Sequence, residues 1–108
     1  MATKRTSRFR GRWRIVETNA WASDVLDLDG TAQIAFEAGG LGKLQMIALH
    51  ADIDHRADGD RIEFSWAGFD EGDPVSGRGF ARLVDGRLLG KLFIHRGDES
   101  AFVADRMD

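Results

Sequence analysis

The chain has 108 residues, of which 43% are hydrophobic and 31% are charged, and its formal net charge is −3 at pH 7. This length suits a single domain with one core, and this composition argues against a disordered chain. The sequence has no cysteine, which excludes disulfides, thiolate metal sites and a cysteine nucleophile. No apolar run approaches the roughly 20 residues of a membrane-spanning helix, and no apolar stretch follows the basic N-terminus as in a secretory signal. We therefore expect a cytoplasmic protein with one domain at residues 9–108.

Basic residues are concentrated at the N-terminus. Six of the fifteen fall within the first fourteen residues, where there is no acid: Lys4, Arg5, Arg8, Arg10, Arg12 and Arg14. Such a segment is typical of a nucleic-acid-binding arm. We favour a plainer interpretation, because the rest of the chain is acidic and would repel phosphate. The last three arginines then lie on the solvated face of a first strand, and residues 1–8 form a flexible basic N-terminus without a nucleic acid partner.

The first strand and the connection after it are predicted from two different periods. Residues 9–16 alternate between apolar and mostly basic side chains, which is the period of a half-buried antiparallel strand. Residues 19–30 carry three large apolar side chains on one side of a short helix that Gly30 would end: Trp21, Val25 and Leu28. The alternative is an irregular loop in which Ser23 caps a single turn. In both cases the connection must cover another apolar surface.

Further strands follow one another with short turns. Residues 31–38 and 62–66 alternate cleanly. The strand between them starts its alternation at Leu44, and the alternation changes phase near Ile47 to Leu49, which is typical of a β-bulge inside one long strand. A last strand is predicted at residues 101–106. Turns rich in Gly, Asp and Glu separate these segments, at residues 39–42, 57–60, 70–74 and 96–99.

A β-hairpin is predicted at residues 77–95. Asp85-Gly86 lies between two strand-like runs, and this dipeptide is typical of a type I′ turn, in which both central residues need a positive φ. A two-residue turn pairs Val84 with Arg87 and so fixes the face on which every side chain lies. One face then carries small and aliphatic residues: Gly77, Gly79, Ala81, Leu83, Leu88, Gly90, Leu92 and Ile94. The other face carries mainly bases and aromatic residues: Arg78, Phe80, Arg82, Arg87, Leu89, Lys91, Phe93 and His95.

Seven short strands, or eight if the long third strand splits, predict an all-β protein. We expect an antiparallel up-and-down barrel with a short helix or lid after the first strand. Gly11-Arg12-Trp13 resembles the G-x-W motif with which lipocalin-type (calycin) barrels begin. The resemblance implies that Trp13 packs across one end of the barrel beneath a basic side chain of the last strand, for which Arg106 is the candidate. It also implies that the first connection lies over the barrel mouth, whereas the family's tyrosine-bearing middle motif is absent.

The glycine-rich face of the hairpin leaves two interpretations of the barrel interior. Its three glycines and one alanine remove side-chain volume, and this makes room either for a small ligand or for aromatic rings of other strands. The rings available to fill this space are those of Trp13, Phe64 and Trp66. We favour filling by rings, because protein interiors are close-packed.

The opposite face of the hairpin supplies our leading hypothesis for function. Bases beside aromatic rings suit a small anionic or aromatic molecule, so we expect a non-catalytic binding protein without a cofactor. The expected ligand-binding residues are Arg78, Lys91, His95, Phe80 and Phe93, with Trp21 and Trp66 as apolar walls. One alternative is a solvated face whose long side chains lie over the rings. Another inverts the hairpin, so that this face lines the barrel interior.

Two other function classes remain open. A protein-interaction module, such as a homodimer, would use an exposed patch formed by Phe80, Leu89 and Phe93. A small hydrolase or isomerase would use His95, which lies opposite Ser76 in the predicted register. Asp73 or Asp98 would then orient the histidine.

Metal binding is the less favoured interpretation of the acidic residues. His50, Asp52 and Asp54 share one strand face at a spacing that suits a hard cation. Five carboxylates in two turns would meet at one end of the barrel, where they would suit Ca²⁺: Asp70, Glu71, Asp73, Asp98 and Glu99. We expect both sets to be solvated, because acidic residues are common in turns and discourage pairing at sheet edges.

Overall fold

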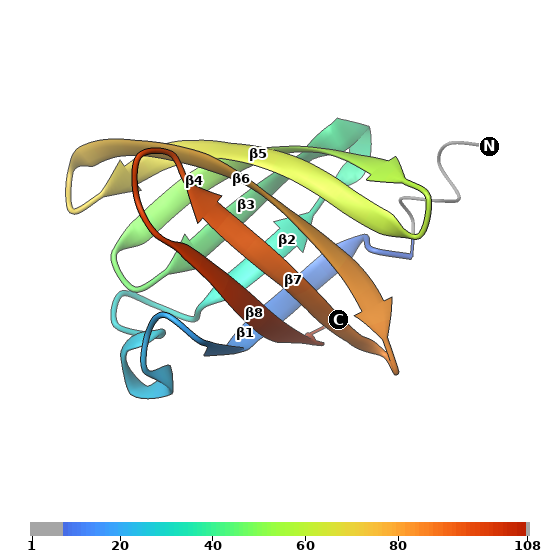
Figure 1. The fold of residues 1–108 in the computed structure, drawn as a ribbon, viewed down its shortest axis with the longest axis horizontal. Coiled ribbons are helices and arrows are strands. Elements are labelled where there is room, and N and C mark those ends of the chain that lie inside the picture. The colour runs from blue at the N-terminus through green and yellow to red at the C-terminus, as the bar shows by residue number, and fades with distance from the viewer. Residues whose placement is uncertain (1–7, 108) are drawn as a thin grey trace.

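The computed structural model describes residues 8–107, in which eight antiparallel strands close into a barrel in chain order, with β1 paired to β8 (Figure 1). The strands are β1 (Gly11–Thr18), β2 (Gln33–Phe36), β3 (Leu41–Met46), β4 (Leu49–Asp58), β5 (Arg61–Asp70), β6 (Asp73–Val84), β7 (Arg87–Ile94) and β8 (Glu99–Arg106). The described helical segments are 3-10 turns at Ser23–Val25 and Ala38–Gly40. The predicted all-β, up-and-down barrel is therefore confirmed. Of the predicted flexible N-terminus, residues 1–7 lie outside the described residues.

The long third strand of the prediction splits into β3 and β4. Met46 pairs with Leu49, so Ile47 and Ala48 form a two-residue turn where we expected a β-bulge. The predicted β-bulge was wrong. A two-residue turn produces the same change of phase in the sequence, because it also places both flanking apolar residues on one face. Ile47 has a φ of 58°, which is unusual for a β-branched residue. Its backbone N–H donates a hydrogen bond to the Leu26 carbonyl at 2.7 Å, and the residue packs against the core, which offsets the strain.

The connection after β1 is mostly irregular, and its predicted helical face was wrong. A single 3-10 turn without a side-chain cap directs Leu26 inward, where it is 2% exposed. Val25 and Leu28 are 38% and 68% exposed instead, and Trp21 packs at the edge of the core. One 3-10 turn does not propagate the 3.6-residue period on which the predicted face depended. Ser23 does not cap the turn, whose N-cap is Ala22.

Side-chain hydrogen bonds fasten this connection at both of its ends. The Asn19 Oδ1 atom accepts from the Ala101 backbone N–H at 2.7 Å, on β8. At the other end, the Asp27 carboxylate accepts from the Ala32 N–H and from Arg14 on β1, both at 2.7 Å. The Ala32 hydrogen bond and, to a smaller extent, Arg14 lower the pKa of Asp27. The connection is therefore held across the end of the barrel where β1 finishes (Figure 1).

The β6–β7 hairpin has the predicted register, with Val84 opposite Arg87 and Gly77 opposite Ile94. Its glycine face lies inside the barrel, and aromatic rings fill the space that the missing side chains leave. A Cβ atom built on Gly77 would lie 2.5 Å from the Trp66 ring, and one on Gly79 would lie 2.6 Å from the Phe64 ring. A Cβ on Gly90 would similarly meet Phe102 at 2.7 Å. The alternative in which the basic and aromatic face lines the barrel interior is therefore wrong, and the glycine positions are close-packed.

The opposite end of the barrel is closed around Trp13. Its indole Nε1 donates to the Phe9 carbonyl at 2.9 Å, and both side chains are almost fully buried. The Arg106 guanidinium lies 4.0 Å from the centroid of the Trp13 ring, which confirms the predicted cation–π contact. Arg106 also donates to the carbonyls of Arg8 and Arg10, at 2.8 Å each. These hydrogen bonds tie the segment before β1 to the last strand.

Candidate functional site

Two rows of side chains cross the outer face of β4, β5, β6 and β7. Neighbouring members of each row are directly paired residues on adjacent strands, so their backbones lie about 4.8 Å apart. The first row contains an acid, a hydroxyl, a base and a ring: Asp54, Ser65, Arg78 and Phe93. The second row contains a base, an acid, a ring and a base: Arg56, Glu63, Phe80 and Lys91. Rings and cations from different strands therefore alternate on one surface.

The two phenylalanine rings of these rows are covered by cations. The centroids of Phe80 and Phe93 lie 6.2 Å apart. The Arg61 guanidinium lies 4.9 Å from the centroid of Phe80, and the Arg78 guanidinium lies 5.1 Å from that of Phe93. The Lys91 ammonium lies 5.6 Å from the Phe93 centroid. Each contact of this kind at an exposed site stabilises the cation over the ring by about 0.5–1 kcal/mol.

Most of the charges in these two rows are paired, and within residues 8–107 the exceptions are Arg78 and Asp54. Glu63 accepts a hydrogen bond from Arg61 at 2.9 Å and lies 3.7 Å from Arg56. Lys91 lies 2.9 Å from Glu99. Within residues 8–107, Arg78 has no carboxylate partner. Its guanidinium therefore keeps its hydrogen-bond donors available to a ligand.

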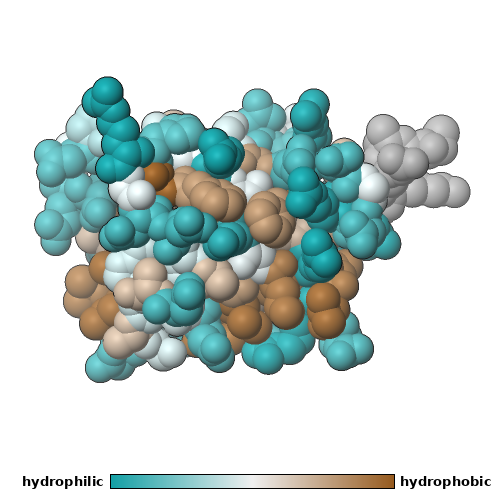
Figure 2. Space-filling view, viewed as in Figure 1, coloured by the Kyte–Doolittle hydropathy of each residue, from teal (hydrophilic) through white to brown (hydrophobic). Residues whose placement is uncertain are grey.

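These residues surround an open depression of about 620 Å³, which we call the cationic hollow. Its outward-facing lining residues are Asp54, Arg56, Arg61, Glu63, Ser65, Arg78, Phe80 and Phe93. Three arginines and two acids give this lining a formal net charge of +1, although the whole chain has −3. In Figure 2, hydrophobic side chains show between hydrophilic ones over β6 and β7. The hollow therefore combines apolar ring surface with a local positive charge.

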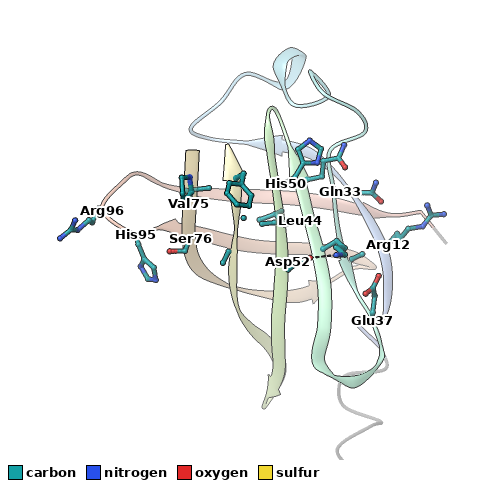
Figure 3. Close-up of a pocket in the computed structure, with 18 residues that line it drawn as sticks. Arg12, Gln33, Glu37, Leu44, His50, Asp52, Val75, Ser76, His95 and Arg96 are labelled. Carbon is teal, nitrogen blue, oxygen red and sulfur yellow. Dashed lines mark hydrogen bonds and ion pairs between the residues drawn. The ribbon is translucent and has the colours of Figure 1, made fainter. Parts of the chain in front are cut away.

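A second, larger depression crosses the outer face of β1 to β6 and has a volume of about 1020 Å³. We call it the waist groove, and Figure 3 shows its lining, with Ser76 and His95 on one side and Arg12 and Glu37 on the other. Small side chains such as Ala35 and Ala67 form part of its lining. Lys43 and Asp52 form an ion pair across it (dashed in Figure 3). Its charged groups come from β1, β3, β4 and the turns after β2 and β7, so they do not converge on one small ligand.

The structure brings together only part of the predicted ligand-binding set. Arg78, Phe80 and Phe93 line the cationic hollow, and Lys91 contacts it through Phe93. His95 lines the waist groove instead. Trp66 is 3% exposed and packs inside the barrel against Gly77, and Trp21 lies in the connection after β1. Neither tryptophan is a wall of the hollow, because the first is on an inward position and the second is in a segment at the barrel end.

Ser76 and His95 are neighbours through their backbones. The His95 N–H donates to the Ser76 carbonyl at 2.9 Å, as the predicted register requires. Among the described residues, no side-chain hydrogen bond joins His95 to Ser76, Asp73 or Asp98. A nucleophile needs a base within hydrogen-bond reach and a third group that orients the base. This geometry does not supply that arrangement.

The residues considered for metal binding lie on the surface and are partly occupied by other partners. Asp52 pairs with Lys43, and His50 Nε2 lies 2.8 Å from the Asp29 carboxylate. Asp54 is exposed on the same face of β4. The acidic turns before β6 and before β8 lie at one end of the barrel, as predicted (Figure 1). No group of three His, Asp or Glu residues within 8–107 is placed to hold a metal ion.

Several residues of the cationic hollow were missed by the sequence analysis. Asp54, Arg61, Glu63 and Ser65 come from β4 and β5, and their contact with the hairpin depends on strand order and register. The alternation of residues 61–66 already indicated that Arg61, Glu63 and Ser65 face outward. The further signal is that consecutive strands of a meander are neighbours, which places β5 beside β6. The exact partner of Arg78 still depends on the turn between those strands.

His55 is a buried histidine that the sequence analysis also missed. Its side chain points inward from β4, and its ring meets Phe36 edge-on at 5.2 Å between centroids. The His55 Nε2 atom lies 3.0 Å from the Glu37 carbonyl, so this nitrogen is the protonated one. The hydrogen bond fastens the turn between β2 and β3 to β4. We therefore assign His55 a structural role.

No protein family model, no curated protein and no solved structure matches this chain. The fold and the geometry of the site therefore carry the functional argument. No helix within residues 8–107 is long and apolar enough to cross a membrane. The cytoplasmic location stays a prediction.

Proposed function

We propose that the protein is a non-catalytic binding protein that holds a small anionic and aromatic molecule in the cationic hollow. The observation that supports this most directly is Arg78, which lies over the Phe93 ring and has no carboxylate partner within residues 8–107. The fork of N–H donors on its guanidinium is the geometry that binds two oxygens of one oxyanion. The group is thus preorganised before a ligand arrives.

The outer face is a better candidate than the barrel interior. Lipocalin-type barrels are the family that this chain resembles, and the contact of Arg106 with Trp13 supports a reduced barrel of that type as part of the proposal. In this chain, however, the rings of Phe64, Trp66 and Phe102 occupy the space beside the interior glycines. A ligand inside the barrel would have to displace them, at a cost of several kcal/mol for disrupted packing.

The rings and cations of the hollow suit an aromatic ligand for two reasons. A flat ring gains contact with the guanidinium planes and with the exposed edges of Phe80 and Phe93. An anionic group gains charge-assisted hydrogen bonds from Arg78, which are about twice as strong as neutral ones. Because the hollow is open to solvent, we expect weak to moderate affinity and rapid exchange.

The experiment is a ligand titration followed by NMR. Small aromatic acids, with benzoate as the first probe, are added to the ¹⁵N-labelled protein, and we expect the Arg78 Nε–H and the amides of β5, β6 and β7 to shift. Arg78→Ala should abolish the shifts. Arg82→Ala is the matched control, because Arg82 is an exposed base on the same strand outside the hollow, and it should leave them unchanged. Equal loss in both variants, or no shift with any aromatic acid, would contradict the proposal.

A protein-interaction surface is the weaker alternative. The predicted patch is reduced, because Phe80 and Phe93 are only partly exposed and are covered by Arg61, Arg78 and Lys91. Apolar exposure remains at Leu89, which is 36% exposed. A homodimer through this face predicts that light scattering reports a mass of two chains and that Phe93→Glu halves it.

A further inference from the structure

The ligand class of the cationic hollow follows from its balance of charges, and this inference rests on the proposed function. Glu63 already pairs with Arg61 and Arg56. One cation, Arg78, is then left without a carboxylate, and one acid, Asp54, is left without a base within residues 8–107. We propose that the hollow selects flat aromatic monocarboxylates over dianionic phosphate esters, and that Asp54 is the residue that sets this limit.

The order of groups in the first row gives the physical basis. Ser65 pairs directly with Arg78 on one side and with Asp54 on the other. A carboxylate that accepts from the Arg78 fork lies beside the Ser65 hydroxyl, which supplies a further donor. Two strand spacings separate the backbones of Asp54 and Arg78, about 10 Å. A ligand anion between them therefore meets attraction from one side and repulsion from the other.

The number of charges on the ligand decides the balance. Attraction to a fixed cation grows in proportion to the ligand charge, whereas the cost of removing water from an ion grows with the square of that charge. A second negative charge therefore gains no more attraction to the one unpaired cation than the first, but it loses more hydration. The repulsion from Asp54 adds to this cost. A monoanion is consequently the better match to a lining whose net charge is +1.

The shape of the ligand acts in the same direction. A carboxylate lies in the plane of the ring that carries it in benzoate, so the whole ligand is flat and suits a fork-to-fork contact with a guanidinium. A phosphate ester is tetrahedral and carries a third oxygen on the side of Asp54 or Glu63. One of these carboxylates would then lie near an oxygen that bears charge.

The test compares three probes at pH 8 by NMR titration: benzoate, phenyl phosphate and neutral benzyl alcohol. The second pKa of a phosphate ester is about 6, so phenyl phosphate is a dianion at pH 8. We expect roughly tenfold tighter binding of benzoate than of phenyl phosphate, and no binding of benzyl alcohol. Asp54→Asn should reduce the preference by roughly two- to sixteenfold, as expected for one unit of charge about 10 Å away at an effective dielectric constant between 20 and 80.

Asp52→Asn is the matched control for Asp54→Asn. It removes an exposed acid from the same face of β4, but Asp52 pairs with Lys43 outside the hollow, so the preference should stay at the wild-type value. Phenyl phosphate binding as tightly as benzoate, or an Asp54→Asn preference equal to that of the wild type, would overturn the inference while leaving the proposed function intact. Failure of both anions to bind would instead reject the proposed function and this inference with it.

Discussion

The inner and outer faces of the β6–β7 hairpin serve different purposes, although they alternate along the same two strands. The inner face carries glycines against which the rings of Phe64, Trp66 and Phe102 pack, so no additional atom fits there. The outer face carries long charged side chains over half-exposed rings, where substitution leaves the packing unchanged. The stability of this hairpin therefore depends on its small residues, whereas the proposed ligand binding depends on its large ones.

The largest expected effect comes from adding one carbon to the inner face. Gly77→Ala would place a Cβ 2.5 Å from the Trp66 ring and against the Phe93 carbonyl, and the backbone group has no freedom to move. We expect the free energy of unfolding to fall by about 3 kcal/mol, as for overpacked cores. Urea unfolding measures this as a lower midpoint with an unchanged slope.

Gly59→Ala is the control for this substitution. Gly59 has a φ of +66° with nothing within 4 Å of the added Cβ, so the loss should be only about 1 kcal/mol and come from the backbone alone. A loss at Gly77 no larger than the loss at Gly59 would show that packing on the inner face is looser than the structure indicates.

A second experiment tests whether ring packing is the cause. A Cβ on Gly79 would lie 2.6 Å from both the Phe64 ring and the Lys91 carbonyl. We expect Gly79→Ala to cost about 2 kcal/mol, and Gly79→Ala combined with Phe64→Leu to cost about 1 kcal/mol less than the sum of the single changes. Strict additivity in this double-mutant cycle would mean that the backbone carbonyl, and not the ring, excludes a side chain at position 79.

The outer face should respond in the opposite way. Arg78→Ala removes an exposed cation–π contact with Phe93, and we expect it to lower the free energy of unfolding by no more than about 1 kcal/mol. Chemical denaturation measures this on the same variant whose binding of benzoate is tested. Destabilisation by 2 kcal/mol or more would show that Arg78 is a structural residue and would remove the contrast between the faces.

The smallest effect concerns the pH dependence of an ion pair on the outer face. Arg87 of β7 donates to Asp105 at 2.7 Å, and this hydrogen bond lowers the pKa of Asp105 below its ordinary value of 3.8. A carboxyl group with a lowered pKa stabilises the folded state above its unfolded pKa, and the contribution is lost as the pH falls through the folded pKa. Asp105→Asn should therefore differ slightly from the wild type above about pH 4 and match it near pH 2. Thermal melts across this range check the trend, and a difference that grows toward acid pH would contradict it.

The sequence predicted those parts of the fold that depend on local signals. The Asp85-Gly86 turn fixed the pairing of Val84 with Arg87, and the contact between Trp13 and Arg106 was anticipated from a motif and the last strand. The turn at Ile47 was missed, because a β-branched residue with positive φ is not a turn signal and is tolerated only through its contacts with the connection after β1. Local patterns do not carry that information.

Prediction of the candidate site was limited in the same way. Arg78, Phe80 and Phe93 were grouped correctly on one face because they belong to a single hairpin. Trp66 was correctly expected among the rings that fill the barrel interior, but it was also expected as a wall of the ligand site, and its inward position excludes that second role. Asp54, to which we assign the limit on ligand charge only as a proposal, was considered in the sequence for metal binding alone. Asp54 lies near Arg78 only because three strands pair side by side, and no short segment of the sequence encodes that arrangement.

Closure of the barrel through β1 and β8 also bears on how the chain folds. From β2 onward, consecutive strands meet across short reversals, whereas Trp13 and Arg106 come together only after nearly the whole chain is ordered. Joining two strands so far apart in the sequence carries the greatest loss of chain entropy. We therefore expect the pairing of β1 with β8 to form last during folding. We expect the amide hydrogens of β1 and β8 to exchange with solvent sooner than those of β5 and β6, because the barrel would open first between β1 and β8.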